Sequence, residues 1–281
     1  MVANQMGAEL NFDYLKEVYF TFGKNVPYFL KCGVELQICP VMLENSLIFN
    51  SSYGILDIDK NSSSNPDVIS MSYLKFLLVE KMSDNYCKQQ LFNICKLCLG
   101  LNNPYLKLDD NKKAVLYEIG EEGIILSINQ KEFEDIKRII LYQNLPDYND
   151  DYISPDFKKA MQEQDELKTK NIELPSLERK INIIASHTGI LPKEQLKMTM
   201  RNHMLLFKEV VGEVNFQATK ALSLYAGKSD EVQWIYPTKK DRFDEYITSV
   251  EEYNKSFGGD GNIISSPNTT IQNMINKFAN Y

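Results

Sequence analysis

The longest regular pattern of apolar residues in the chain lies between Met200 and Gly227. Apolar side chains recur there at the three- and four-residue intervals that place them on one side of a helix. They are Met204, Phe207, Val211, Val214, Ala218, Ala221 and Tyr225. Glu209, Glu213 and Lys220 fall on the far side, and Gly227 suits the residue after a helix C-terminus. The pattern predicts one long amphipathic helix whose apolar stripe packs in the core, since packing stabilises most helices.

Helical patterns also cover much of the remaining chain. Pro66 and Pro192 stand where predicted helices begin, and Gly100 and Gly189 stand where others end. The expected helices cover residues 66–77, 84–99, 131–142, 155–170 and 175–186, with a short one from Pro192 and a weaker tendency over 43–56. Beyond the long helix we expect an extended piece over 231–236 and helices over 240–255 and 270–279.

Short strands are predicted in the first half of the chain. Residues Val34–Cys39 alternate apolar and polar side chains and stop at Pro40, which is typical of a half-buried strand. Three further runs, separated by turn-forming residues, predict a small antiparallel meander. These runs are Tyr105–Leu108, Ala114–Ile119 and Gly123–Ile128. Residues 10–24 mix both periods and allow either structure.

These elements indicate an α+β fold that is mainly helical. The small antiparallel sheet belongs to the N-terminal part, and a helical domain follows. The acidic segment Leu145–Tyr152, with Pro155 just after it, marks the expected boundary. We therefore expect an α+β domain over residues 1–146, a helical domain over 153–256 and a flexible tail over 257–281, which is rich in Gly, Ser, Asn and Thr at its start.

Composition and charge argue against some classes of function. The 281 residues are 43% hydrophobic and carry a net charge of −7. An acidic chain without a dense Lys/Arg stripe is a poor binder of nucleic acid. No segment approaches the roughly 20 apolar residues that a membrane-spanning helix needs, and Met1–Leu10 lacks the pattern of a signal peptide. The five cysteines suit reduced thiols in a cytoplasm.

The cysteine pair Cys95-x-x-Cys98 allows two readings. It could be a redox pair or half of a metal site, although no histidine and no second such pair lies nearby in sequence. Cys87, Cys95 and Cys98 also share one apolar face of the predicted helix with Leu91 and Ile94. That placement favours packing in the core.

Two loops resemble ligand-binding patterns only in part. Asp57-x-Asp59-x-Asn61 matches the start of a calcium loop, but Val68 stands where a bidentate glutamate is needed. We interpret it as a turn with solvated carboxylates. The glycine-rich segment Phe257–Asn262 is followed by no Gly-Lys-Ser/Thr, so a flexible linker is favoured over a phosphate loop.

The sequence offers no convincing catalytic constellation. His187 and His203 are the two imidazoles, and Ser186 beside His187 does not aim a hydroxyl at a ring nitrogen on a helix. His187 suits a helix C-terminus instead. Paired carboxylates such as Glu121–Glu122 and Asp150–Asp151 lie in turns and linkers, where solvated charge explains them. No catalytic, cofactor-binding or metal-binding residue is assigned, and no cofactor is expected.

The long helix carries further apolar residues outside its main stripe. Together with its first residue they form the candidate partner-binding set: Met200, Leu205, Leu206, Val210, Phe216 and Leu224. One reading is a helix packed on several sides, or apolar residues scattered singly on a surface. The other is a groove or ridge left open for a helix of a partner, which methionines at its start would make adaptable.

Six segments, taken in their order along the chain, carry a resemblance to a known group of proteins. They are LQICPV (Leu36–Val41), DIDKN (Asp57–Asn61), ISMSYLKFL (Ile69–Leu77), QEQDEL (Gln162–Leu167), LERKI (Leu177–Ile181) and the helix Met198–Val211. The chain resembles tail and baseplate morphogenesis proteins, described as assembly-chaperone-like, from phages of low-GC Gram-positive bacteria. The resemblance lies in the general residue pattern and in the order of these segments, and it covers about two thirds of the chain.

The resemblance implies a non-enzymatic protein of the host cytoplasm that binds a phage tail, baseplate or tape-measure protein before assembly. It carries over no catalytic residue. The alternative is a virion structural subunit of the tail, baseplate or neck, and a third hypothesis is an enzyme or host-takeover factor. We expect no nucleic-acid or membrane partner, and the sequence leaves self-association into a homo-oligomer open.

Overall fold

A computed structural model of the chain describes residues 10–151, 153–170, 173–225, 243 and 246. Contacts divide the chain into two units, residues 1–155 with 173–234 and residues 156–172 with 235–281. This grouping differs from the expected division, because residues 173–225 contact the N-terminal part. The predicted elements over 231–236, 240–255 and 270–279, and the glycine-rich segment, lie outside the described residues apart from Phe243 and Tyr246.

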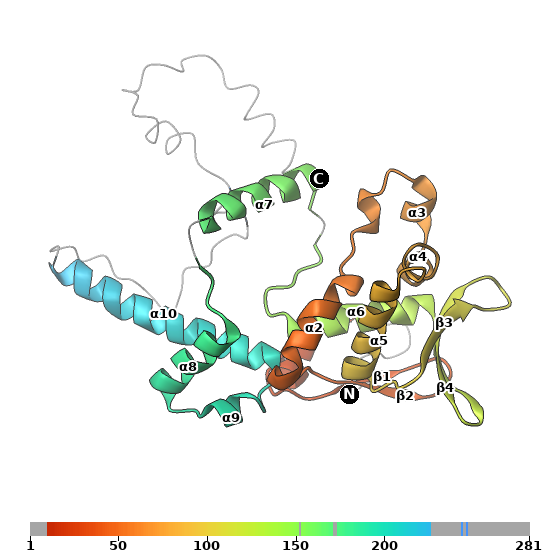
Figure 1. The fold of residues 1–281 in the computed structure, drawn as a ribbon, viewed down its shortest axis with the longest axis horizontal. Coiled ribbons are helices and arrows are strands. Elements are labelled where there is room, and N and C mark those ends of the chain that lie inside the picture. The colour runs from red at the N-terminus through yellow and green to blue at the C-terminus, as the bar shows by residue number, and fades with distance from the viewer. Residues whose placement is uncertain (1–9, 152, 171–172, 226–242, 244–245, 247–281) are drawn as a thin grey trace, which may run out of the picture. The chain divides into compact units, whose positions relative to one another are not determined.

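The first part of the chain alternates short helical turns with two strands before one long helix (Figure 1). Its elements are α1 (Phe12–Leu15), η1 (Lys16–Phe20), β1 (Val26–Phe29), β2 (Glu35–Ile38), η2 (Leu43–Asn45), α2 (Ser46–Ser52), η3 (Tyr53–Leu56), η4 (Lys60–Ser62), α3 (Pro66–Ser70), α4 (Tyr73–Phe76), η5 (Leu77–Lys81) and α5 (Asn85–Leu99).

A three-stranded sheet and the remaining helices follow. They are β3 (Pro104–Leu108), β4 (Ala114–Gly120), β5 (Gly123–Ile128), α6 (Gln130–Asn144), α7 (Pro155–Thr169), α8 (Leu177–Thr188), α9 (Pro192–Gln195) and α10 (Met200–Tyr225). The α+β fold is confirmed: it is mainly helical, with small antiparallel sheets in the N-terminal half and helices after them.

Both sheets are antiparallel. Strand β2 confirms the prediction over Val34–Cys39, and its buried Leu36 and Ile38 alternate with exposed residues. Its partner β1 was not predicted, and Val26 of β1 lies opposite Ile38. The second sheet has the order β3-β4-β5 and confirms the meander, with a bulge where the register shifts after Glu118.

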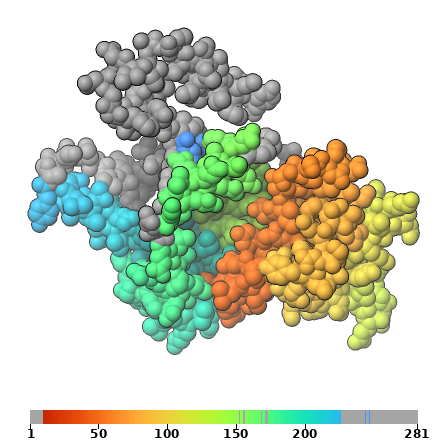
Figure 2. Space-filling model, turned by 45° about the horizontal axis from the view of Figure 1, so that its top comes forward, coloured from red at the N-terminus to blue at the C-terminus, as the bar shows by residue number. Residues whose placement is uncertain are grey.

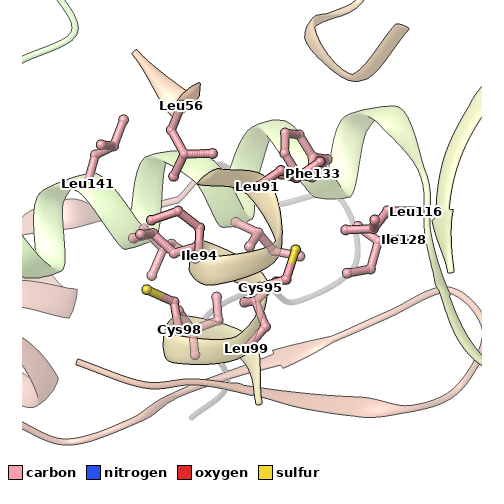
Figure 3. Packing of buried hydrophobic residues seen from close by; sticks show 14 of the residues in the cluster. Leu56, Leu91, Ile94, Cys95, Cys98, Leu99, Leu116, Ile128, Phe133 and Leu141 are labelled. Atoms are coloured by element: carbon pink, nitrogen blue, oxygen red, sulfur yellow. The ribbon is translucent and has the colours of Figure 1, made fainter. Parts of the chain in front are cut away.

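Helices α5 and α6 supply the centre of the core (Figure 3). Leu91, Ile94, Cys95 and Cys98 of α5 are buried, and Phe133 of α6 lies near them. Burying a side chain of this size contributes about 1.5–3 kcal/mol. The two thiols pack with aliphatic side chains, as the helical spacing predicted, and burial raises the pKa of each. Such thiols stay protonated and unreactive.

The single helix predicted over residues 66–77 is wrong. Met71 has extended backbone angles, φ −67° and ψ 149°, and separates α3 from α4. Ser72 then caps α4, because its hydroxyl accepts a hydrogen bond from the Lys75 amide at 3.3 Å. A serine that bonds backbone amides favours a new helix start over the helix interior. In contrast, α5 ends as predicted at Gly100, which has φ +67°.

The second unit contains α7, predicted over residues 155–170, and two described residues of the C-terminal part. The rings of Phe157 and Phe243 meet edge to face, with centroids 5.3 Å apart. The hydroxyl of Tyr246 donates to the carboxylate of Asp165 at 2.9 and 3.0 Å. Both contacts join α7 to residues at least 81 positions later in the chain.

Buried polar side chains connect segments of the first unit that are distant in sequence. The Glu118 carboxylate, 7% exposed, accepts hydrogen bonds from the backbone amides of Asn102 and Asn103 at 3.0–3.2 Å. Glu132 accepts from the amides of Lys31 and Asn129 at 2.6 and 2.8 Å. Each carboxylate therefore fixes a loop against the core.

Replacing Glu118 with alanine should lower the free energy of unfolding by about 1–3 kcal/mol, because two backbone amides lose their acceptor. Urea denaturation followed by circular dichroism measures the change. Glu121→Ala is the matched control, since this exposed turn residue should change stability by less than about 0.5 kcal/mol. Equal losses in the two variants would contradict the role given to Glu118.

Candidate partner-binding surface of helix α10

The start of α10 is built into the core of the first unit. The Met200 amide donates to the Val41 carbonyl, and the Leu43 amide donates to the Met198 carbonyl, both at 2.8 Å. Met42 and Thr199 form an antiparallel bridge between these bonds. This short piece of β-pairing joins the segment after β2 to the segment before α10. The helix therefore begins at a fixed place and in a fixed direction.

Arg201 extends this attachment into the core. Its side chain is 5% exposed, and Nη1 donates to the Tyr142 carbonyl at 2.7 Å. The guanidinium carbon lies 5.8 Å from the centre of the Phe20 ring, a geometry of cation–π contact. Burial lowers the pKa of this guanidinium, and the nearby Asp147 carboxylate opposes that shift. Arg201 thus connects α10 to both α6 and η1.

A buried pair of polar side chains joins α8, α9 and α10. Gln195 is fully buried, and its Nε2 donates to the carbonyls of Ile181 and Ile190 at 3.0 Å each. Its Oε1 lies 3.2 Å from Nε2 of His203. Because Oε1 can only accept, His203 donates through Nε2. Burial, and then the Lys180 ammonium, lower the pKa of His203, which favours the neutral imidazole.

Helix α8 covers one side of the first half of α10. Lys180 near the start of α8 lies over the Phe207 ring at 5.6 Å. His187 in its last turn lies 2.9 Å from the Glu213 carboxylate. The later residue of α8 contacts the later residue of α10, so the two helices run in the same direction. Helix α8 then ends at Gly189, which has φ +78°, as predicted.

The long helix is confirmed, but the prediction that its whole apolar stripe is core is wrong. Met204 packs against the core and Phe207 is half-buried. Beyond them Val214 is 48% exposed and Tyr225 is 92% exposed. Val211, Ala218 and Ala221 are exposed as well. The reason is length, because α10 continues for about three turns past Glu213, the residue that contacts the end of α8 (Figure 1).

The candidate partner-binding residues fall into three groups. Met200 and Val210 are buried, at 3% and 4% exposure, and so face the interior. Leu206 and Phe216 are half-buried, and Lys220 lies 5.8 Å from the Phe216 ring centre. Leu205 and Leu224 are exposed. The structure therefore leaves Leu205, Leu206, Phe216 and Leu224 accessible at least in part. The C-terminal part of α10 lies at the surface in Figure 2.

The other candidate motifs have plain structural roles. Asp59 caps η4 by accepting a hydrogen bond from the Asn61 amide at 3.1 Å. The Asp150 carboxylate accepts from Tyr142 and Arg138 at 2.7 and 2.5 Å. Burial raises the pKa of Asp150, but these hydrogen bonds and the charge of Arg138 together outweigh it, and the net shift is downward. Asp59 therefore fixes local backbone, and Asp150 binds two side chains of α6.

Some structurally decisive residues were missed from the sequence. Asn129 and Glu132 form a capping box at the start of α6, and their three-residue spacing is a signal that was available. No comparable signal marks Arg201 or Gln195. Their partners are backbone carbonyls brought close by tertiary folding. From sequence alone, a long polar side chain on a helix is expected to be exposed to solvent, because such residues are rarely buried.

Within the described part of the chain, no group of three or more His, Cys, Asp or Glu side chains could hold a metal ion. None of the helices there combines the length and apolar character required to cross a bilayer. A shallow, open hollow of about 550 Å³ lies beside the second sheet, lined in part by Phe92, Tyr105 and Ile119. Its described lining brings no convergent set of ionisable groups together.

Comparison with protein-family models, with curated proteins and with solved structures finds no match for this chain.

The neutral state of His203 predicts how stability depends on pH. An imidazole in the unfolded chain titrates near pH 6.5, and the native pKa lies lower. Between these values the unfolded state binds more protons, so the free energy of unfolding should fall as the pH drops below about 6.5. Chemical denaturation at several pH values measures this loss.

His203→Gln should remove the part of the loss that this imidazole causes. His187→Gln is the matched control, because His187 lies in the partly exposed contact with Glu213 and the buried imidazole is left in place. A His203→Gln protein that loses stability as steeply as the wild type would contradict a buried, neutral His203.

Proposed function

We propose that this protein is a non-enzymatic assembly factor that binds another protein through α10. One observation carries the proposal. The helix is anchored at its start and continues past α8, so large apolar side chains remain in solvent, among them Leu222 and Leu224 at 69% and 74% exposure. Leaving such residues on a surface is unfavourable in water, and an anchored apolar ridge is typical of a site for a protein partner.

The resemblance to tail and baseplate morphogenesis proteins supports a more specific form of the proposal. In that form the partner is a tail, baseplate or tape-measure protein, and binding takes place in the host cytoplasm before assembly. The second candidate is a structural subunit of the virion. The same exposed helix favours it, because a permanent subunit interface would bury these side chains equally well.

Leu205→Asp and Phe216→Asp should each abolish capture of the partner, because a carboxylate placed in an apolar interface is left unpaired. Capture is measured by affinity purification of the tagged full-length chain from infected cells, followed by mass spectrometry. Asn215→Asp is the matched control, since it adds the same charge on the exposed residue directly before Phe216. Circular dichroism checks that each variant folds.

Soluble extract and finished particles are analysed separately. Capture of one tail or baseplate protein from the extract, with this chain absent from particles, supports the assembly factor. Stoichiometric presence in particles supports the structural subunit. Capture that survives both aspartate variants would contradict α10 as the binding surface, and loss of folding in the Leu205 variant would show that this side of α10 is core.

A further inference from the structure

We propose that the exposed half of α10 pairs with the same half of α10 in a second copy of this chain. The pairing surface, called the seam below, consists of Val211, Val214, Ala218, Ala221 and Tyr225. This inference goes beyond the proposed function. It concerns the opposite side of the helix from Phe216, which lies about 160° around the axis from Ala218 at 3.6 residues per turn.

The spacing of the seam is that of a coiled coil. Its residues follow one another at alternating intervals of three and four, and the same series includes Met204 and Phe207 further toward the N-terminus. Apolar residues repeating every 3.5 positions on average form a stripe that winds slowly around a helix, and two helices with this pattern pair by supercoiling. The exposed part, from Val211 to Tyr225, is about 21 Å long at 1.5 Å per residue.

The structure already uses this region of α10 for helix packing. Helix α8 lies beside its first half, from the Lys180–Phe207 contact to the His187–Glu213 contact. Where α8 ends, the apolar positions continue and become exposed, with Val214 at 48%. A second helix on the seam would continue an established helix–helix interface. That continuity favours a helix over a strand as the occupant.

The charges favour a second copy as the occupant of the seam. The positions that flank the seam in the exposed half are Asn215, Gln217, Leu222 and Leu224, all uncharged. Identical copies can therefore meet without repulsion at the edges of the interface, although the chain carries a net charge of −7. Glu213 and Lys220 are the charged residues between 211 and 225. Both lie on the flank of the helix away from the seam, so neither adds repulsion to the pair.

The small side chains at the centre fit this arrangement. Ala218 lies at the middle of the exposed half, and Ala221 is one turn further on. Alanines at the crossing point let two helix backbones approach toward the short end of the usual 8–10 Å interaxial range. The larger Val211 and Tyr225 then lie at the two ends.

The test is the mass of the purified full-length chain, measured by sedimentation equilibrium as the concentration is raised. The wild type should change from 32.4 kDa toward twice that mass. Ala218→Glu should remain at 32.4 kDa because it places a charge at the centre of the seam. Thr219→Glu, which adds the same charge on an exposed neighbour, should dimerise like the wild type.

Lys220→Glu is a second control. It changes the charge on an exposed residue that lies away from the seam, so this variant should dimerise like the wild type. A wild type that stays monomeric at every concentration would overturn the proposal, as would equal behaviour of the Ala218 and Thr219 variants. Loss of dimerisation in Lys220→Glu would overturn the seam as the pairing surface.

These outcomes are separable from those of the proposed function. Dimerisation is measured on the purified chain alone, and Phe216→Asp should leave it unchanged. Partner capture lost in Phe216→Asp with dimerisation intact supports both. Dimerisation without any captured partner would contradict the proposed function and leave the pairing of α10 in place.

Discussion

The attachment of α10 depends on a short piece of backbone pairing between distant segments. Two hydrogen bonds join Val41 and Leu43 to Met200 and Met198, and they flank a bridge between Met42 and Thr199. Backbone groups buried without partners are costly, so this pairing is both satisfied and specific. It brings residues 173–225 into the first unit. The direction of α10, and hence the position of its exposed half, follows from it.

Polar side chains complete what the backbone pairing begins. Arg201, Gln195 and Glu118 each satisfy backbone groups of segments that are distant in sequence, and each is nearly or fully buried. Buried hydrogen bonds of this kind add about 1 kcal/mol each when made and are more costly when one partner is lost. They therefore fix which loops meet, while the buried apolar side chains of the core, those of α5 and α6 among them, supply most of the stabilisation.

The fold could be predicted from the sequence as far as local pattern determines it. Gly100, Gly189 and Pro192 placed helix ends correctly, and strand β2 followed from simple alternation in Val34–Cys39. The break at Ser72 was missed because a capping serine and an interior serine look alike in sequence. The stripe of α10 was predicted with the right spacing, but its burial depends on where α8 ends. Periodicity shows which side of a helix is apolar, and tertiary structure decides how much of that side is covered within one chain.

The central claim is that α10 has an anchored half and a free half, and hydrogen exchange at its backbone amides tests this most directly. In dilute solution the amides of Arg201–Val210 should exchange only on global unfolding. Those of Val214–Tyr225 should exchange through local opening, which has a lower free energy. At concentrations where the chain dimerises, the second group should gain protection. Uniform protection along the whole helix at every concentration would contradict the claim, because it would show that the seam is already covered within a single chain.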